Sequence, residues 1–140
     1  MAWTQKSYGW DHKRLPVGPD PFQHWYRDEQ VYFITARCRE KYPAFANESA
    51  RSVFWDRFIH YTAMHKFEPW VATLMNNHYH FVGYCTVGSE MRELMRKLHG
   101  SVAKLVNDVL PERRVPFWRG DDGHDYFDGC LRDDDQYLKA

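Results

Sequence analysis

The stretch WVATLMNNHYHFVGYCT, residues 70–86, decides how this chain is expected to fold. Both of its halves are dense in β-branched and aromatic residues, which are typical of strands, and the Asn76-Asn77 pair between them is a good two-residue turn. The stretch therefore predicts a β-hairpin at the centre of a sheet, in which WVATLM forms one strand and HYHFVGYCT returns beside it.

A strand and a helix are predicted ahead of this hairpin. The run VYFITARC (31–38) alternates two sets of side chains and is rich in strand-forming residues. Asn47 or Ser49 can cap a helix. Apolar residues after this cap recur at steps of three and four as far as about Phe67, which is the pattern of an amphipathic helix. This region therefore predicts one strand followed by one helix.

A second helix and a final strand are predicted after the hairpin. The amphipathic segment from Ser89 to Leu110 contains Gly100 in its middle, which indicates a close approach to the sheet or a bend. DYFDGCL (125–131) is strand-like, and the aspartates of RDDDQYLKA (132–140) suit the start of a further helix.

The order β-α-β-β-α-β with a helix after it predicts an α+β, ferredoxin-like split βαβ fold. Such a fold is an antiparallel sheet with two helices on one face, here with a C-terminal helix added. We expect residues 31–140 to form this domain. Residues 1–30 contain prolines, glycines and aromatic residues without a sustained period, and we expect them to be a leader packed on the domain.

The composition is that of one globular domain. The chain has 140 residues, of which 44% are hydrophobic, and it contains no apolar run long enough to cross a bilayer. Its first residues, MAWTQKSYGWDHKR, lack the apolar centre of a signal peptide, so we expect a cytoplasmic protein without a membrane partner. The three cysteines form no CxxC pair, which favours reduced core residues over disulfides or zinc ligands.

The charges are balanced overall but unevenly distributed. The net charge is zero, so the whole molecule has no strong field that would indicate nucleic acid as its partner. Basic residues nevertheless gather between positions 92 and 119, and aspartates follow between 121 and 135. This division is typical either of a basic binding face beside an acidic edge or of two ordinary solvated surfaces.

His78 and His80 are the residues whose spacing indicates chemistry. Alternate residues of a strand project from the same face about 7 Å apart, so both imidazoles can converge on one ion. Imidazole suits transition metals, and a site with two such ligands has positions open for water or a phosphate oxygen. The alternative is that the strand simply has two polar residues on its outer face.

Three segments resemble one family in the correct order. MNNHYHFVGY is similar to the His-hydrophobic-His (HUH) signature of single-tyrosine transposases, with Asn76 where proline is common. VYFITARCREKYPAF resembles the first strand of that family with its following arginine. PFWRGDDGHDYFDGCLRDDDQYL resembles its later segment, and the similarity is greatest to the REP-associated tyrosine transposases and their insertion-sequence relatives.

This resemblance implies metal-dependent cleavage and rejoining of single-stranded DNA. His78 and His80 match the positions that hold a divalent ion, Mg or Mn, and a tyrosine attacks the phosphate to form a 5′-phosphotyrosine. Single-stranded or hairpin DNA is the expected partner, and the chain can be a monomer or a homodimer. The alternative from a different class is a DNA-hairpin-binding module that performs no strand transfer, and a third is a small metal-binding or ligand-binding domain without nucleic acid.

The remaining expected site residues are DNA contacts and the nucleophile. Basic groups bind phosphates and aromatic rings stack on unpaired bases. The candidates are Arg92, Arg96, Arg113, Arg114, Trp118 and Arg119, although Trp118 can equally close the core. Tyr137 is the candidate nucleophile, but the family's tyrosine is expected several residues beyond Ala140, which suggests a truncated form. Tyr126 lies in the predicted final strand, where a role in the core or a groove is favoured.

Overall fold

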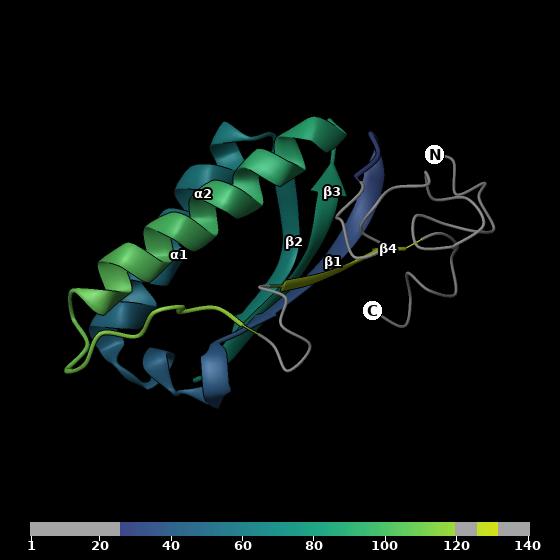
Figure 1. Ribbon diagram of the computed structural model, residues 1–140. Helices are drawn as coiled ribbons and strands as arrows, with labels where there is room; N and C mark the ends of the chain where they lie inside the picture. The colour runs from purple at the N-terminus through teal and green to yellow at the C-terminus, as the bar shows by residue number, and fades with distance from the viewer. Residues whose placement is uncertain (1–25, 120–125, 132–140) are drawn as a thin grey trace.

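The computed structural model describes residues 26–119 and 126–131, which form one sheet and two long helices (Figure 1). The elements in chain order are β1 (Gln30–Arg37), η1 (Arg39–Lys41), η2 (Ala44–Ala46), α1 (Glu48–Met64), β2 (Phe67–Leu74), β3 (His78–Cys85), α2 (Gly88–Asn107) and β4 (Tyr126–Leu131). This order confirms the predicted β-α-β-β-α-β plan, and the predicted C-terminal helix lies outside the described residues.

The sheet has the strand order β2-β3-β1-β4, and every neighbouring pair is antiparallel. This is the ferredoxin-like arrangement, in which the two strands that precede the helices, β1 and β3, pair at the centre of the sheet, and the strands that follow the helices, β2 and β4, form its edges. The predicted hairpin forms, and the amide of Met75 donates to the carbonyl of His78 across its turn, at 2.8 Å. Only β3 of this hairpin is central, however, because β2 lies at the edge.

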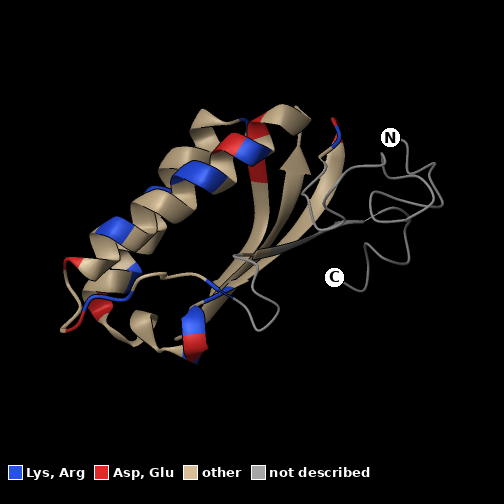
Figure 2. Ribbon diagram, in the orientation of Figure 1, with Lys and Arg blue, Asp and Glu red and all other residues tan. Residues whose placement is uncertain are grey.

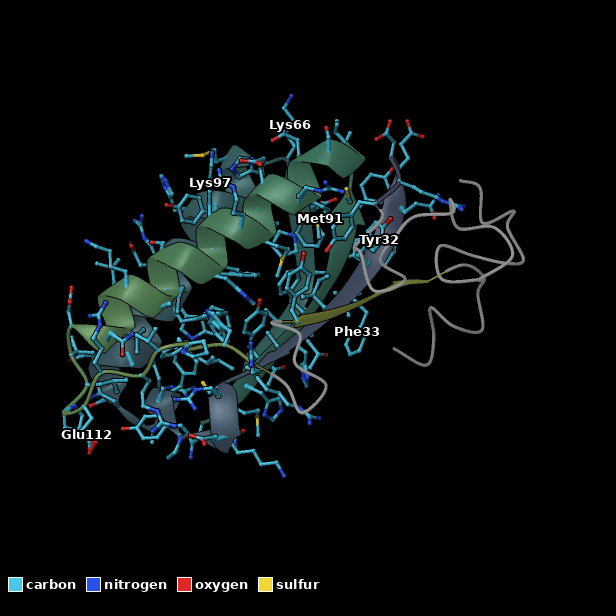
Figure 3. All side chains as sticks on the ribbon, viewed as in Figure 1. Tyr32, Phe33, Lys66, Met91, Lys97 and Glu112 are labelled. Carbon is cyan, nitrogen blue, oxygen red and sulfur yellow. The ribbon has the colours of Figure 1, made fainter. Side chains whose placement is uncertain are left out.

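Both helices lie on the same side of the sheet (Figure 1). Successive residues of a strand project from opposite faces, and Figure 3 shows Tyr32 directed toward the helices and Phe33 directed away from them. The core lies on the helix side and includes Tyr32, Tyr79, Phe81 and Met91. We call the opposite side of the sheet the open face.

α1 begins where the sequence predicts but ends earlier. The side chain of Asn47 accepts a hydrogen bond from the amide of Ala50 at 3.0 Å, which is the predicted N-cap. The helix ends at Met64, because Lys66 adopts a left-handed backbone conformation with φ of 58°, and Phe67 already belongs to β2. The prediction that the helix reaches Phe67 was therefore wrong by one turn.

Gly100 does not mark a close approach of α2 to the sheet. It is exposed, and a Cβ placed there would meet no atom within 4 Å. The close approach is at Gly83 in β3, where a Cβ would collide with the carbonyl oxygen of Glu68 and the ring of Phe67. The absence of a side chain at Gly83 therefore lets β2 lie against β3 at this point.

Cys38 and Cys85 are buried free thiols, as predicted. Burial raises the pKa of each thiol to about 12, so both remain protonated at neutral pH. In the described part of the chain, no helix is both long and apolar enough to cross a membrane.

Candidate metal and nucleic-acid site

His78 and His80 lie next to each other on the open face of β3. The burial of β3 alternates residue by residue, with Tyr79 and Phe81 in the core and the two histidines partly exposed. Their ring centroids are 5.9 Å apart. The strand therefore presents two imidazoles side by side, as the sequence predicts, and we call them the histidine pair.

The surroundings of the histidine pair come from the neighbouring strands. Thr35 of β1 and Thr73 of β2 are the direct partners of His80, and Arg37 of β1 is the partner of His78. Because opposite residues in an antiparallel sheet share a face, the histidine pair is bordered by two hydroxyls and one guanidinium. Phe33 packs against His80, with their ring centroids 6.1 Å apart.

The electrostatics of His78 favour its neutral form. Partial burial is the main cause that lowers the pKa of His78, and the nearby charges of His80 and Arg37 lower it further. Its Nδ1 is hydrogen-bonded to Oδ1 of Asn77 at 2.9 Å, which requires that Nδ1 carry the proton. This bond fixes the ring and leaves Nε2 as the atom with a lone pair for a ligand.

This donor set fits a divalent ion with an open coordination sphere. A metal lies about 2.1 Å from an imidazole nitrogen, so two rings on one ion have centres within roughly 6 Å of each other. The histidine pair already meets that condition. Among the described residues, no group of three or more His, Cys, Asp and Glu side chains could hold a metal. Further ligands at this pair would be water, a substrate oxygen, a neighbouring hydroxyl or amide oxygen, or groups outside the described residues.

A second feature is a groove of about 700 Å³ beside α2 on the helix side of the sheet. Its walls are one surface of α2 and the segment from 113 to 118, and its floor is aromatic. Figure 2 shows Lys and Arg bands along α2 and on the segment that follows it. The basic side chains that line it are Arg92, Arg96, Lys104, Arg113 and Arg114. We call it the basic groove.

The structure thus brings four of the predicted basic DNA contacts together, namely Arg92, Arg96, Arg113 and Arg114. Arg96 and Arg114 each also form an ion pair with a glutamate. Arg96 pairs with Glu93 at 2.6 Å, and Arg114 pairs with Glu40 at 3.0 Å while its guanidinium lies 4.3 Å from the ring centroid of Tyr42. Arg114 therefore fastens the 113–118 segment to η1. Arg119 is exposed and lies outside the groove.

Trp118 is not the exposed stacking platform that the sequence suggests. It is 3% exposed, its ring stacks on His99 with centroids 4.3 Å apart, and its Nε1 donates to the carbonyl of His99 at 3.1 Å. A nucleobase needs an open ring face, so Trp118 forms the floor of the basic groove and closes the core. The structure therefore agrees with the alternative interpretation of Trp118, in which its ring closes the core.

Tyr126 and Tyr137 are the two tyrosines that the sequence raised as possible nucleophiles. Tyr126 begins β4 opposite Ala36, lines the basic groove and accepts a hydrogen bond from Tyr26 at 3.2 Å. Ala36 is buried on the helix side, so Tyr126 is on the wrong face for attack beside His78 and His80. Tyr137 lies outside the described residues.

Two residues of these sites, Arg37 and Lys104, were not predicted from the sequence. Lys104 belongs to the basic stretch, and it follows Arg92 and Arg96 at multiples of four residues, which places all three on one side of a helix. This spacing could have been used to select it. Arg37 follows the strand pattern of β1, but its position opposite His78 depends on the pairing of β1 with β3. That pairing joins residues about forty positions apart and cannot be derived from local sequence.

No protein-family model matches the sequence, and no curated protein does. Two solved structures match the fold. A REP-associated tyrosine transposase bound to a REP hairpin has a TM-score of 0.58 and 14% identity, and the match covers 84% of this chain and 66% of that one. A protein of Deinococcus radiodurans R1 assigned to the transposases has a TM-score of 0.59 and 14% identity, with 89% of this chain and 96% of that one covered.

The chain thus spans just under two thirds of the REP-associated transposase and nearly all of the Deinococcus protein. At this level of identity, the likeness concerns the arrangement of helices and strands. It agrees with the family resemblance of the three sequence segments, which rests on different observations. The chain has the fold of these two transposase structures.

Proposed function

We propose that this chain binds single-stranded or hairpin DNA and performs metal-dependent cleavage and rejoining of a DNA strand, as in DNA transposition. The observation that carries the proposal is the histidine pair, whose imidazoles lie 5.9 Å apart on the open face of a central strand. The fold is that of two transposase structures, one of which is bound to a REP hairpin.

His78 and His80 are the residues that would hold the divalent ion, Mg or Mn. When bound, such an ion polarises a phosphate oxygen and so stabilises the charge that develops on the phosphate. The neutral state of His78, favoured by its lowered pKa, supports this role, because only an unprotonated imidazole nitrogen can bind a metal.

The covalent step would use a tyrosine hydroxyl as nucleophile. The phenolic oxygen forms a bond to phosphorus as the bond from phosphorus to the 3′-oxygen breaks, and the phenolic proton is transferred to that leaving oxygen. The products are a 5′-phosphotyrosine and a free 3′-hydroxyl, and the reverse reaction rejoins the strand. Tyr137 is the candidate within the chain.

The basic groove would bind the DNA backbone. Arg92 and Arg113 line it, and phosphate contacts position nucleic acid without reading its sequence. The groove lies on the helix side and the histidine pair on the open face, so the proposal assigns binding and chemistry to different surfaces.

The second candidate is a hairpin-binding module without strand transfer. One observation favours it: the sheet tyrosines Tyr32, Tyr79 and Tyr126 project toward the helices, away from the histidine pair. Tyr84 shares their face, but it is four residues from His80, about 13 Å along the strand, and stacks with Trp70.

A cleavage assay separates the two candidates. A labelled hairpin oligonucleotide with a single-stranded extension is incubated with the chain and Mn²⁺ or Mg²⁺, then resolved on a denaturing gel. The enzyme proposal predicts a slowly migrating covalent adduct that EDTA and the His78→Ala/His80→Ala variant abolish, and the Tyr137→Phe variant tests the nucleophile. Hairpin binding in a native gel without any adduct under either metal would contradict strand transfer and support the module.

A further inference from the structure

Two arginines from distant parts of the sequence meet beside the histidine pair. The segment after α2 returns to the end of β1, where the amide of Arg119 donates to the carbonyl of Arg37 and the amide of Arg39 donates to the carbonyl of Phe117, each at 2.9 Å. Cys38 and Trp118 form an antiparallel bridge between these bonds. Arg37 and Arg119 are therefore direct partners across this short ladder.

Directly paired residues of an antiparallel ladder share a face, so Arg119 lies with Arg37 on the open face. Cys38 and Trp118 are buried on the helix side, at 2% and 3% exposure, and each is adjacent in sequence to one of the arginines. Arg37 and Arg119 are both exposed, and Arg37 is also the direct partner of His78 across β1 and β3. Directly paired residues have Cα atoms about 5.5 Å apart, so the two guanidinium groups can act on one ligand.

Among the described residues, Glu40 at this end of the sheet is already paired with other arginines. Glu40 pairs with Arg39 at 3.2 Å and with Arg114 at 3.0 Å. Within residues 26–119 and 126–131, no carboxylate forms an ion pair with Arg37 or Arg119. Among the described side chains these two guanidinium groups have no acidic partner, and a bound anion would relieve their mutual repulsion.

We propose that Arg37 and Arg119 form a clamp for one phosphate of a single DNA strand, next to the phosphate that the histidine pair addresses. The proposal rests on the proposed function and adds to it the residues that position the strand. Guanidinium forks match the geometry of phosphate oxygens and bind them through two parallel hydrogen bonds.

The clamp also connects the two surfaces of the site. Trp118 forms part of the floor of the basic groove, and its neighbour Arg119 is on the other side of the same segment. The segment from 117 to 119 therefore separates the groove from the histidine pair. A DNA strand that leaves the basic groove would cross the edge of the sheet at this segment. It would meet the clamp before it reaches His78.

The test measures binding of a fluorescent 12-nucleotide single strand by anisotropy, in EDTA so that no metal contributes. The variants are Arg37→Gln, Arg119→Gln, the double variant and Arg37→Lys/Arg119→Lys. The matched control is Lys66→Gln, an exposed cation at the far end of the molecule (Figure 3). Circular dichroism melts of all variants check that each is folded.

We expect the double Gln variant to bind at least 10-fold more weakly. The slope of log affinity against log salt should decrease by about 0.7 for each phosphate that the protein no longer neutralises. The double Lys variant, which keeps the charge without the fork, should lie between it and the wild type, and Lys66→Gln should equal the wild type. If the folded double Gln variant binds the single strand as tightly as the wild type does, the clamp is overturned but the proposed function is not. A wild-type chain that binds no single strand would overturn the proposed function and the clamp with it.

Discussion

The hydroxyl of Tyr79 and Nε2 of His99 are joined by a hydrogen bond of 2.6 Å in the core between β3 and α2. Both residues are buried, and Tyr79 stands between His78 and His80 in the sequence but projects from the opposite face. The strand that presents the histidine pair is thus anchored to α2 through the residue between them.

Removal of this hydroxyl should destabilise the fold. Tyr79→Phe would deprive the buried Nε2 of His99 of this hydrogen bond, and such a change costs about 1–3 kcal/mol. Urea unfolding monitored by circular dichroism should show a lower midpoint with an unchanged slope. Tyr42→Phe is a suitable comparison, because Tyr42 is partly exposed. A Tyr79→Phe variant as stable as the wild type would show that the bond contributes nothing.

Two glycines should respond in opposite directions to substitution by alanine. Gly83→Ala introduces a Cβ into the backbone of Glu68, so β2 and β3 must separate, at a cost of about 1–3 kcal/mol or more. Gly100→Ala adds a methyl group to an exposed helical position with open space around it and should stabilise by about 0.5–1 kcal/mol. Thermal melts of both variants test this. A stabilising Gly83→Ala would contradict the close approach of the two strands.

The sequence was sufficient for the elements whose pattern is local. The period-two alternation of HYHFVGYC indicates a strand with both histidines on one face, and the Asn76-Asn77 pair indicates the turn. The end of α1 was not predictable, because it depends on a left-handed conformation at Lys66, a residue type that rarely adopts one.

Features that depend on distant residues could not be predicted from local sequence. Trp118 is buried because His99, nineteen positions earlier, stacks on it from α2. Gly83 and Gly100 look alike in the sequence, and only the spatial position of Glu68 distinguishes them. Arg37 becomes a site residue through its pairing with His78 in the sheet.

His78 should titrate below the ordinary histidine pKa of about 6.5, because burial, His80 and Arg37 all disfavour its charged form. Well above pH 6.5 the ring is neutral in both the folded and the unfolded chain, so it has no effect on stability there. As the pH falls from 6.5 to the folded pKa, the unfolded chain binds more protons and the folded state loses stability.

NMR titration of the His78 ring proton measures this pKa directly. Arg37→Gln removes one of the opposing charges and should raise the pKa of His78 toward 6.5, whereas Lys66→Gln should leave it unchanged. A His78 pKa above 6.5 in the wild type would contradict the described environment of the ring.

The basic groove should contribute most of the salt-dependent binding of hairpin DNA. Arg92→Gln/Arg113→Gln removes two cations from its lining, so affinity should fall by about 10-fold or more, with a smaller dependence on salt. Arg57→Gln is the control, because Arg57 lies on α1, pairs with Asp56 at 2.7 Å and does not line the groove. Equal reductions in the two variants would show that the groove is not the binding surface.

The histidine pair is the central claim, and calorimetric titration with Mn²⁺ tests it most directly. The wild type and His60→Ala, which removes an exposed histidine of α1, should take up the ion with the same affinity. His78→Ala and His80→Ala should each weaken uptake by 10-fold or more, and the double variant should abolish it, because the site then has no imidazole ligand. Undiminished Mn²⁺ binding by a folded double variant would contradict the account.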